Sequence, residues 1–108
     1  MKQYNVSIPG RTWRLIENHV RFVAQVNIRA AYHTKERLMR AIDSLKERPE
    51  SHPYLEWDGF PQEKYRKLVV PKWYVILYTV ENDTVHIDYV LDCRQDNLRI
   101  IEKLENKP

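Results

Sequence analysis

The most regular pattern along the chain is an alternation of apolar and polar residues over positions 84–91. Successive side chains on a strand point to opposite faces of its sheet, so this segment predicts a strand with two unlike faces. One face carries apolar side chains, namely Val85, Ile87, Tyr89 and Leu91. The other carries polar or ionisable side chains, namely His86, Asp88, Asp92 and, at the end of the strand, Arg94. A sheet with these two faces has a core side and a side on which function is expected.

Two further strands precede this one within residues 65–96. Residues 73–80 are aromatic or β-branched almost throughout, and a polar turn at 81–83 separates them from the alternating strand. The first of the three strands begins at Tyr65. Short connections join antiparallel neighbours, so we expect a three-stranded antiparallel meander.

The N-terminal half follows a helical period instead. After an opening strand over residues 2–8, apolar residues from Arg11 onward recur at the spacing of a helix with one buried stripe. A second stripe predicts a helix over residues 31–48, which Pro49 stops. The break near 27–30 is short, so we expect an antiparallel helical hairpin. One continuous bent helix is the alternative, because neither Gly nor Pro falls at the join.

The rest of the chain completes the predicted architecture. Residues 49–64 contain three prolines and one glycine and predict a loop, and residues 97–106 predict a short amphipathic helix at the C-terminal end. The predicted order is therefore strand, two helices and three strands, followed by that helix. We expect an α+β fold in one domain, because 108 residues suit a single core but not two.

Composition narrows the class of protein. No apolar run approaches the ~20 residues that a membrane helix needs, and the N-terminus lacks the apolar core of a signal peptide. The single cysteine, Cys93, excludes an internal disulfide and fits a reducing compartment, so we expect a cytoplasmic protein without a membrane partner. Residues 11–48 hold nine Lys or Arg against four Asp or Glu, which gives that segment +5 and the rest of the chain −2. Such a basic surface suits an acidic or phosphate-rich partner, although solvated helix faces explain the same excess.

Candidate chemistry is confined to the predicted sheet. Two glycines do not make a phosphate-binding loop, a lone cysteine argues against a zinc site, and the four histidines lack metal-ligand spacing. We therefore expect no metal and no cofactor. His86 stands out because alternation places it beside Asp88, whose carboxylate would favour the protonated imidazole. A solvated pair on the surface explains the same spacing.

Basic residues gather around the same strands. Arg66 and Lys67 lie on the first strand of the meander, Lys64 precedes it, Lys72 lies at its end, and Arg94 closes the last strand. Strands of a small meander are neighbours, so their register could bring Arg66 and Arg94 to one face, where two guanidinium groups would clamp a phosphate. In the alternative, Arg94 pairs with Asp92 or Asp96 and holds the strand end.

Four segments of the chain resemble the RelE/ParE superfamily, the toxins of bacterial type II toxin–antitoxin systems, and within it the plasmid-stabilisation branch. The segments are Leu45-x-x-x-Pro49, Tyr65-Arg66-Lys67-Leu68, Trp73-Tyr74-Val75-Ile76-Leu77-Tyr78 and Arg94-Gln95-Asp96. The resemblance covers nearly the whole chain and rests on the order and spacing of these segments. It implies a small toxin that a cognate antitoxin wraps and neutralises.

The resemblance implies two kinds of target. RelE-like members cut mRNA on the ribosome with side chains near the C-terminus, whereas ParE-like members act on DNA gyrase without that catalytic set. Arg66 and Arg94 match the family's basic positions. Leu68 stands where some cleaving members have a catalytic histidine, and no tyrosine follows Arg94, so a general base for the 2′-hydroxyl is not evident. The groups that could replace it are His86, Asp88, Asp92 and Asp96.

The first expectation is therefore a toxin that inhibits translation as a ribosome-dependent endoribonuclease (an mRNA interferase) without a metal. Its expected catalytic residues are Arg66, Arg94, His86 and Asp92, and its expected RNA-binding residues are Lys64, Lys67 and Lys72. The expected partners are the antitoxin, the ribosome and mRNA. The alternatives are a ParE-like, non-enzymatic inhibitor of DNA gyrase and a module that binds its antitoxin but is no longer toxic.

Overall fold

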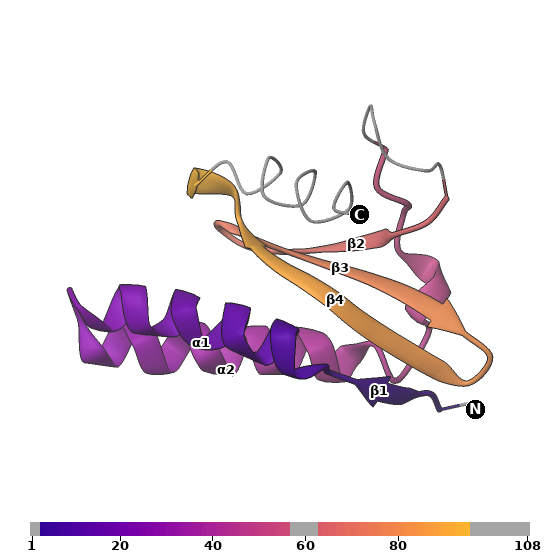
Figure 1. Ribbon diagram of the computed structural model, residues 1–108, viewed down its shortest axis with the longest axis horizontal. Coiled ribbons are helices and arrows are strands. Elements are labelled where there is room, and N and C mark those ends of the chain that lie inside the picture. The colour runs from indigo at the N-terminus through magenta and orange to yellow at the C-terminus, as the bar shows by residue number, and fades with distance from the viewer. Residues whose placement is uncertain (1–2, 57–62, 96–108) are drawn as a thin grey trace.

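The structure is a computed structural model and describes residues 3–56 and 63–95. Its elements are β1 (Asn5–Ser7), α1 (Gly10–Ala24), α2 (Ile28–Ser44), the 3₁₀ turn η1 (Pro49–Ser51), β2 (Arg66–Val70), β3 (Tyr74–Glu81), β4 (Thr84–Asp92) and the 3₁₀ turn η2 (Cys93–Gln95). The two helices form one layer and the four-stranded sheet forms the other (Figure 1). The predicted α+β class, helical hairpin and antiparallel meander are confirmed. The predicted C-terminal helix lies outside the described residues.

The helical hairpin forms because residues 25–27 reverse the chain between α1 and α2. Asn27 caps α2, since its Oδ1 accepts a hydrogen bond of 3.0 Å from the Ala30 backbone N–H. With this cap α2 begins at Ile28, ahead of the predicted residue 31, and it ends at Ser44 rather than at residue 48. The alternative of one continuous bent helix is wrong.

The strand order in the sheet is β1-β4-β3-β2. β2, β3 and β4 pair antiparallel, as predicted, while β1 pairs parallel with β4 over Asn5–Ser7 only. The N-terminal strand thus extends the meander on the β4 side. Because β1 is short, the edge of β4 beyond His86 needs another partner.

Helix α1 supplies that partner with two polar side chains. The Thr12 hydroxyl donates to the carbonyl oxygens of Ile87 at 2.7 Å and Asp88 at 3.0 Å. His19 Nε2 lies 2.7 Å from the carbonyl oxygen of Val90. Positions seven apart lie on one face of a helix, so both side chains point at the same strand edge. α1 thereby satisfies buried carbonyl groups that β1 does not reach.

A β-bulge divides β4 into two halves. Ile87 lies opposite Tyr78 and Tyr89 lies opposite Leu77, so Asp88 has no counterpart in β3. An extra residue in a strand reverses the faces to which the following side chains point. The position of the bulge coincides with the carbonyl groups that Thr12 binds, so α1 stabilises the irregularity.

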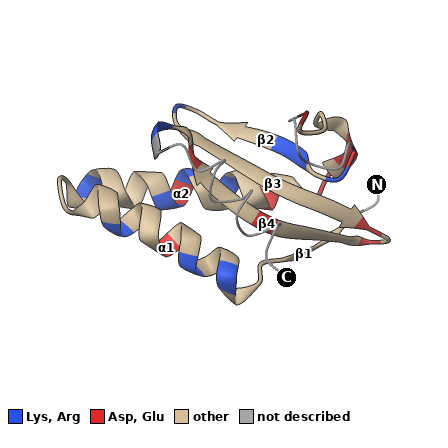
Figure 2. Ribbon diagram, turned by 45° about the horizontal axis from the view of Figure 1, so that its top comes forward, with Lys and Arg blue, Asp and Glu red and all other residues tan. Residues whose placement is uncertain are grey.

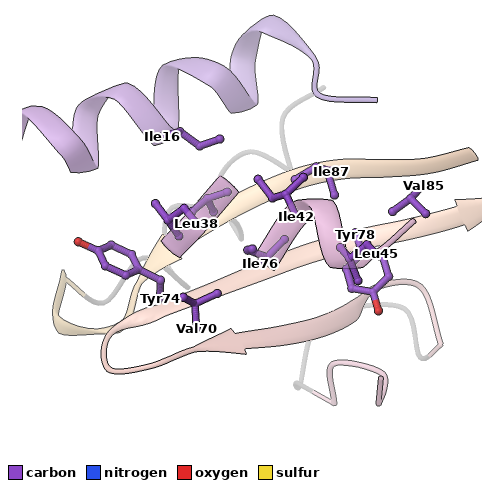
Figure 3. Packing of buried hydrophobic residues seen from close by; sticks show 11 residues of the cluster. Ile16, Leu38, Ile42, Leu45, Val70, Tyr74, Ile76, Tyr78, Val85 and Ile87 are labelled. Carbon is purple, nitrogen blue, oxygen red and sulfur yellow. The ribbon is translucent and has the colours of Figure 1, made fainter. Parts of the chain in front are cut away.

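The bulge sends apolar residues of β4 to two different clusters. The cluster between helices and sheet, seen from close by in Figure 3, consists of Ile16, Leu38, Ile42, Leu45, Val70, Tyr74, Ile76, Tyr78, Val85, Ile87 and Val90. The cluster on the other face consists of Tyr65, Leu77, Tyr89 and Leu91. The alternation predicted for residues 84–91 is therefore wrong beyond Asp88. Asp92 lies on the helix side of the sheet, whereas His86 lies on the other.

Candidate functional site

The two arginines predicted to clamp a phosphate lie toward opposite ends of the sheet. Arg66, at the start of β2, lies opposite Tyr78, whereas Arg94 follows Asp92, which lies opposite Tyr74. Tyr74 and Tyr78 are separated by about 13 Å along β3 at ~3.3 Å per residue. Figure 3 shows their hydroxyl oxygens pointing away from each other at the two ends of the core. The prediction that sheet register brings Arg66 and Arg94 to one patch is wrong.

Arg94 is tied to a buried carboxylate. Asp92 is 1% exposed, and its Oδ1 accepts hydrogen bonds from the backbone N–H of Arg94 at 2.9 Å and from its Nε at 3.0 Å. Oδ2 accepts a third from Nη2 at 2.7 Å. The alternative in which Arg94 pairs with Asp92 and holds the strand end is the arrangement that the structure has.

The protonation of Asp92 follows from this pairing. Burial favours the neutral acid and by itself raises the pKa of the Asp92 carboxyl group. The hydrogen bonds and charge of Arg94, with a smaller effect of His19, outweigh burial and hold that pKa below its ordinary value. Asp92 is therefore charged at neutral pH and is a poor proton acceptor, so its evident role is to orient Arg94.

Aromatic side chains surround the Asp92–Arg94 pair. The Arg94 guanidinium carbon lies 4.9 Å from the centroid of the Trp73 ring, and Trp73 is 43% exposed. Tyr74 is buried, and burial followed by the charge of Asp92 raises the pKa of its phenol. The His19 ring lies 5.5 Å from the Tyr74 ring. This end of the sheet thus presents an exposed indole with a cation held beside it.

Arg66 lies in a different environment. Its Nη1 donates to the carbonyl oxygen of His52 at 2.7 Å and its Nη2 to the hydroxyl oxygen of Tyr54 at 3.0 Å. The guanidinium carbon lies 4.0 Å from the centroid of the Tyr54 ring. Glu50 and Glu63 share with Arg66 the lining of a polar hollow of about 100 Å³. Lys64 also lines the hollow, so the two acidic groups there offset the two cations and leave no excess of positive charge for a phosphate.

The three lysines predicted to hold RNA phosphates do not form one track. Lys67 lies on the sheet face away from the helices. Lys64 Nζ lies 5.0 Å from the centroid of the Tyr65 ring, just before β2. Lys72 lies in the exposed turn between β2 and β3, next to Trp73. Lys64 and Lys67 therefore belong to one end of β2, and Lys72 belongs to the other.

His86 is separated from Asp92, the other residue predicted to act as acid or base. It lies opposite Thr79 near the start of β4 and is half-buried, whereas Asp92 ends the strand on the opposite face. Asp88, predicted to be its partner, is the bulge residue whose carbonyl oxygen accepts the bond from Thr12. The sequence did not single out His19, because the spacing of the four histidines gives it no special place. The structure puts its ring beside Val90 and Tyr74, near Asp92. Its signal in the sequence is a polar residue seven positions after Thr12 on the helix stripe.

Two further properties bear on function. Within residues 3–56 and 63–95, no three His, Cys, Asp or Glu side chains lie close enough together to hold a metal ion. In the same part of the chain, the helices lack the length and apolar content needed to cross a membrane.

Comparison with known proteins adds a structural relative. No family model matches the chain, and no curated protein matches its sequence. A solved structure titled "Chromosomal ParDE TA system from P. aeruginosa" contains a chain that matches with a TM-score of 0.67, over 85% of this chain and 98% of that one. The sequence identity is 10%, so the likeness is one of fold. With its hairpin, meander and parallel N-terminal strand, this chain shares the fold of that ParDE-system chain, as the resemblance of its sequence segments led us to expect.

Proposed function

We propose that this chain is the toxin component of a type II toxin–antitoxin module and that a cognate antitoxin binds and neutralises it. The match to a chain of a ParDE system, which extends over 98% of that chain, supports the proposal. So does the placement of the four toxin-like segments, whose described residues directly follow α2, lie on or next to β2 and β3, and follow β4. An open reading frame for the antitoxin is expected beside the gene.

We infer further that this toxin acts by binding a protein target and not by cleaving RNA. The observation that carries this inference is the separation of Arg66 from Arg94, together with the pairing of Arg94 to buried Asp92. Attack of a ribose 2′-hydroxyl on the adjacent phosphate needs a base and cations that converge on one phosphorus atom. The resemblance to ParE-like members makes DNA gyrase the first target to test.

One observation favours the second candidate, ribosome-dependent mRNA cleavage. Trp73 is exposed beside Arg94, and Lys72 adjoins it in the sequence, a combination suited to stacking on a base while contacting phosphate. In that case Arg66, Arg94, His86 and Asp92 would be the catalytic residues and Lys64, Lys67 and Lys72 would bind RNA. The ribosome would then have to bring separated groups together.

Induction of the chain in bacterial cells, with and without its antitoxin, separates the two candidates. A gyrase-binding toxin should arrest growth and trigger the DNA-damage response while transcripts stay intact. A nuclease should stop amino-acid incorporation first and produce new transcript 5′ ends in primer extension. New 5′ ends that depend on the chain would refute the binding mechanism. Growth without arrest, in cells where the chain still binds its antitoxin, would identify a module that has lost its toxicity.

A substitution in the chain tests the same distinction. Lys72→Ser should leave growth arrest unchanged if the toxin binds a protein elsewhere on its surface, and should weaken RNA cleavage if the Trp73 end holds RNA. Lys46→Ser is the matched control, because Lys46 is exposed in the turn after α2 and its ammonium group pairs with the exposed carboxylate of Asp43. A loss of toxicity in Lys72→Ser alone would favour the nuclease.

A further inference from the structure

The tip of the helical hairpin is a part of the molecule that neither the core nor the Arg94 end uses. α1 and α2 run past the end of the sheet, and the turn between them projects beyond it in both views (Figures 1 and 2). The turn itself is well defined. The backbone N–H groups of Val26 and Asn27 both donate to the carbonyl oxygen of Val23, at 3.0 and 2.9 Å, and Asn27 caps α2.

This tip is unusually apolar for an exposed surface. Val26 is 89% exposed, Tyr32 72%, Ile28 68% and Phe22 49%. Ile28 and Tyr32 are four residues apart at the start of α2 and share one side of that helix. Phe22 lies in the last turn of α1, and Val26 lies in the turn that follows it. Single exposed apolar residues are common on protein surfaces, whereas several large ones gathered around one turn indicate an interaction site.

The charge of the tip is equally one-sided. Residues 18–35 contain Arg21, Arg29 and Lys35 and no Asp or Glu. Figure 2 shows blue and tan ribbon around this turn, with the nearest red segments further back along both helices. A positive rim around apolar anchors complements a partner surface that is acidic around an apolar cleft.

We propose that the hairpin tip docks into an acidic, apolar-lined cleft of the protein that this toxin inhibits; this inference rests on the proposed function. Phe22 and Tyr32 are the aromatic anchors, and Arg21 and Arg29 pair with carboxylates at the rim. A second copy of this chain does not fit, because two tips would bring like charges together. A membrane surface fits less well, because three cations fall short of the roughly four to eight that characterise polybasic membrane contacts.

The test compares tip variants of the full chain for toxicity and for binding to purified antitoxin. The double variant Val26→Ser/Ile28→Ser should weaken toxicity about tenfold or more, scored as the inducer concentration that halves growth, because these two exposed apolar side chains lie between the aromatic anchors and would be buried in the cleft. Arg29→Glu should do the same and Arg29→Lys should not. Val69→Ser, which changes an exposed apolar residue on β2, is the control. Thermal unfolding should be unchanged in all of them, since these side chains lie outside the core.

Toxicity, antitoxin affinity and vesicle binding together distinguish the docking site from its alternatives. Loss of toxicity in the tip variants with antitoxin affinity and melting temperature unchanged supports the docking site. Full toxicity in those variants overturns it and leaves the proposed function standing. If the tip variants lose antitoxin affinity along with toxicity, the tip is an antitoxin contact and the proposed docking site is wrong. If the wild type pellets with phosphatidylserine vesicles and the tip variants do not, the tip binds a membrane and the proposed docking site is wrong. A wild-type chain that never arrests growth refutes the proposed function, and the docking site with it.

Discussion

Replacing Arg94 by methionine should destabilise this protein more than replacing Asp92 by asparagine. Asp92 is 1% exposed, whereas the Arg94 side chain is 37% exposed. R94M leaves a buried carboxylate that has lost two guanidinium hydrogen bonds. D92N leaves a guanidinium group that water still reaches. Substituting the two partners of this ion pair should therefore lower the free energy of unfolding by unequal amounts.

The magnitudes follow from burial. Removing one partner of a buried ion pair lowers the free energy of unfolding by about 3–5 kcal/mol. We expect about 3 kcal/mol for R94M, the low end of that range, because the backbone N–H of residue 94 still donates to Asp92 at 2.9 Å. For D92N we expect about 1–2 kcal/mol, since solvent screens the remaining cation. The double variant D92N/R94M should be more stable than R94M alone by ~1–2 kcal/mol, because it leaves no uncompensated buried charge.

The loss in R94M should also depend on pH. In the wild type the pKa of Asp92 is lowered on folding, so its stabilising effect is present above about pH 4 and disappears as the pH falls through the folded-state value. In R94M the burial that raises the pKa of Asp92 is no longer opposed by the guanidinium. At low pH the carboxyl group of Asp92 in R94M becomes protonated, and the cost of an unpaired buried charge disappears. The difference between R94M and the wild type should shrink between pH 7 and pH 3.

Urea unfolding followed by circular dichroism at pH 7, 5 and 3 measures these differences. Lys46→Met is the matched control, because it removes a cation from an exposed pair with Asp43 and should change the free energy of unfolding by less than about 0.5 kcal/mol. Equal losses for R94M and D92N at pH 7 would contradict the reasoning. So would a double variant whose loss is the sum of the two.

Three further predictions concern the core and its turns. Tyr78→Phe should lose about 1–2 kcal/mol in urea unfolding, because the Tyr78 hydroxyl donates to the carbonyl oxygen of Pro49 at 2.6 Å. Burial raises the pKa of Tyr78 from 10.0 to about 12, so wild-type thermal stability should hold below pH 10 and fall between pH 10 and 12, and the variant should lack this tyrosine's share of the decline. Thr12→Val should be about 1–3 kcal/mol less stable than Thr12→Ser in urea unfolding, because it leaves the Ile87 carbonyl without its side-chain donor; equal values would contradict the role of the hydroxyl. Arg48 adopts a left-handed backbone with φ of 52°, so Arg48→Gly should raise stability by about 0.5–1 kcal/mol in thermal unfolding, and a decrease would contradict the strain argument.

Local patterns were sufficient for the helices and for the order of the elements. The apolar stripe after Arg11 and the stop at Pro49 predicted two helices, because helical periodicity is written into three or four residues at a time. The break near residues 27–30 was predicted, but only the hydrogen bond from the Ala30 N–H to the Asn27 side chain shows where α2 begins. The Asp92–Arg94 pair was one of two readings of a short local spacing, and it is the one that the structure adopts.

The arrangement of the candidate site depended on contacts that local spacing does not encode. Alternation along β4 held as far as Ile87 and then failed, because Thr12 binds the carbonyl oxygens of Ile87 and Asp88 where the strand bulges. That donor comes from the other end of the chain. Register likewise placed Arg66 opposite Tyr78, away from Arg94, and cross-strand register is set by pairing between whole strands.

The sequence by itself therefore determined which segments are helices and strands, their order, and the basic, apolar character of the hairpin. Those properties depend on side-chain periodicity and composition within single segments. Only the tertiary structure decided which face each residue of β4 occupies, how far apart Arg66 and Arg94 lie, and that the hairpin turn projects beyond the sheet. Those properties depend on hydrogen bonds and packing between segments that are distant in the chain, and such contacts form only when the layers come together.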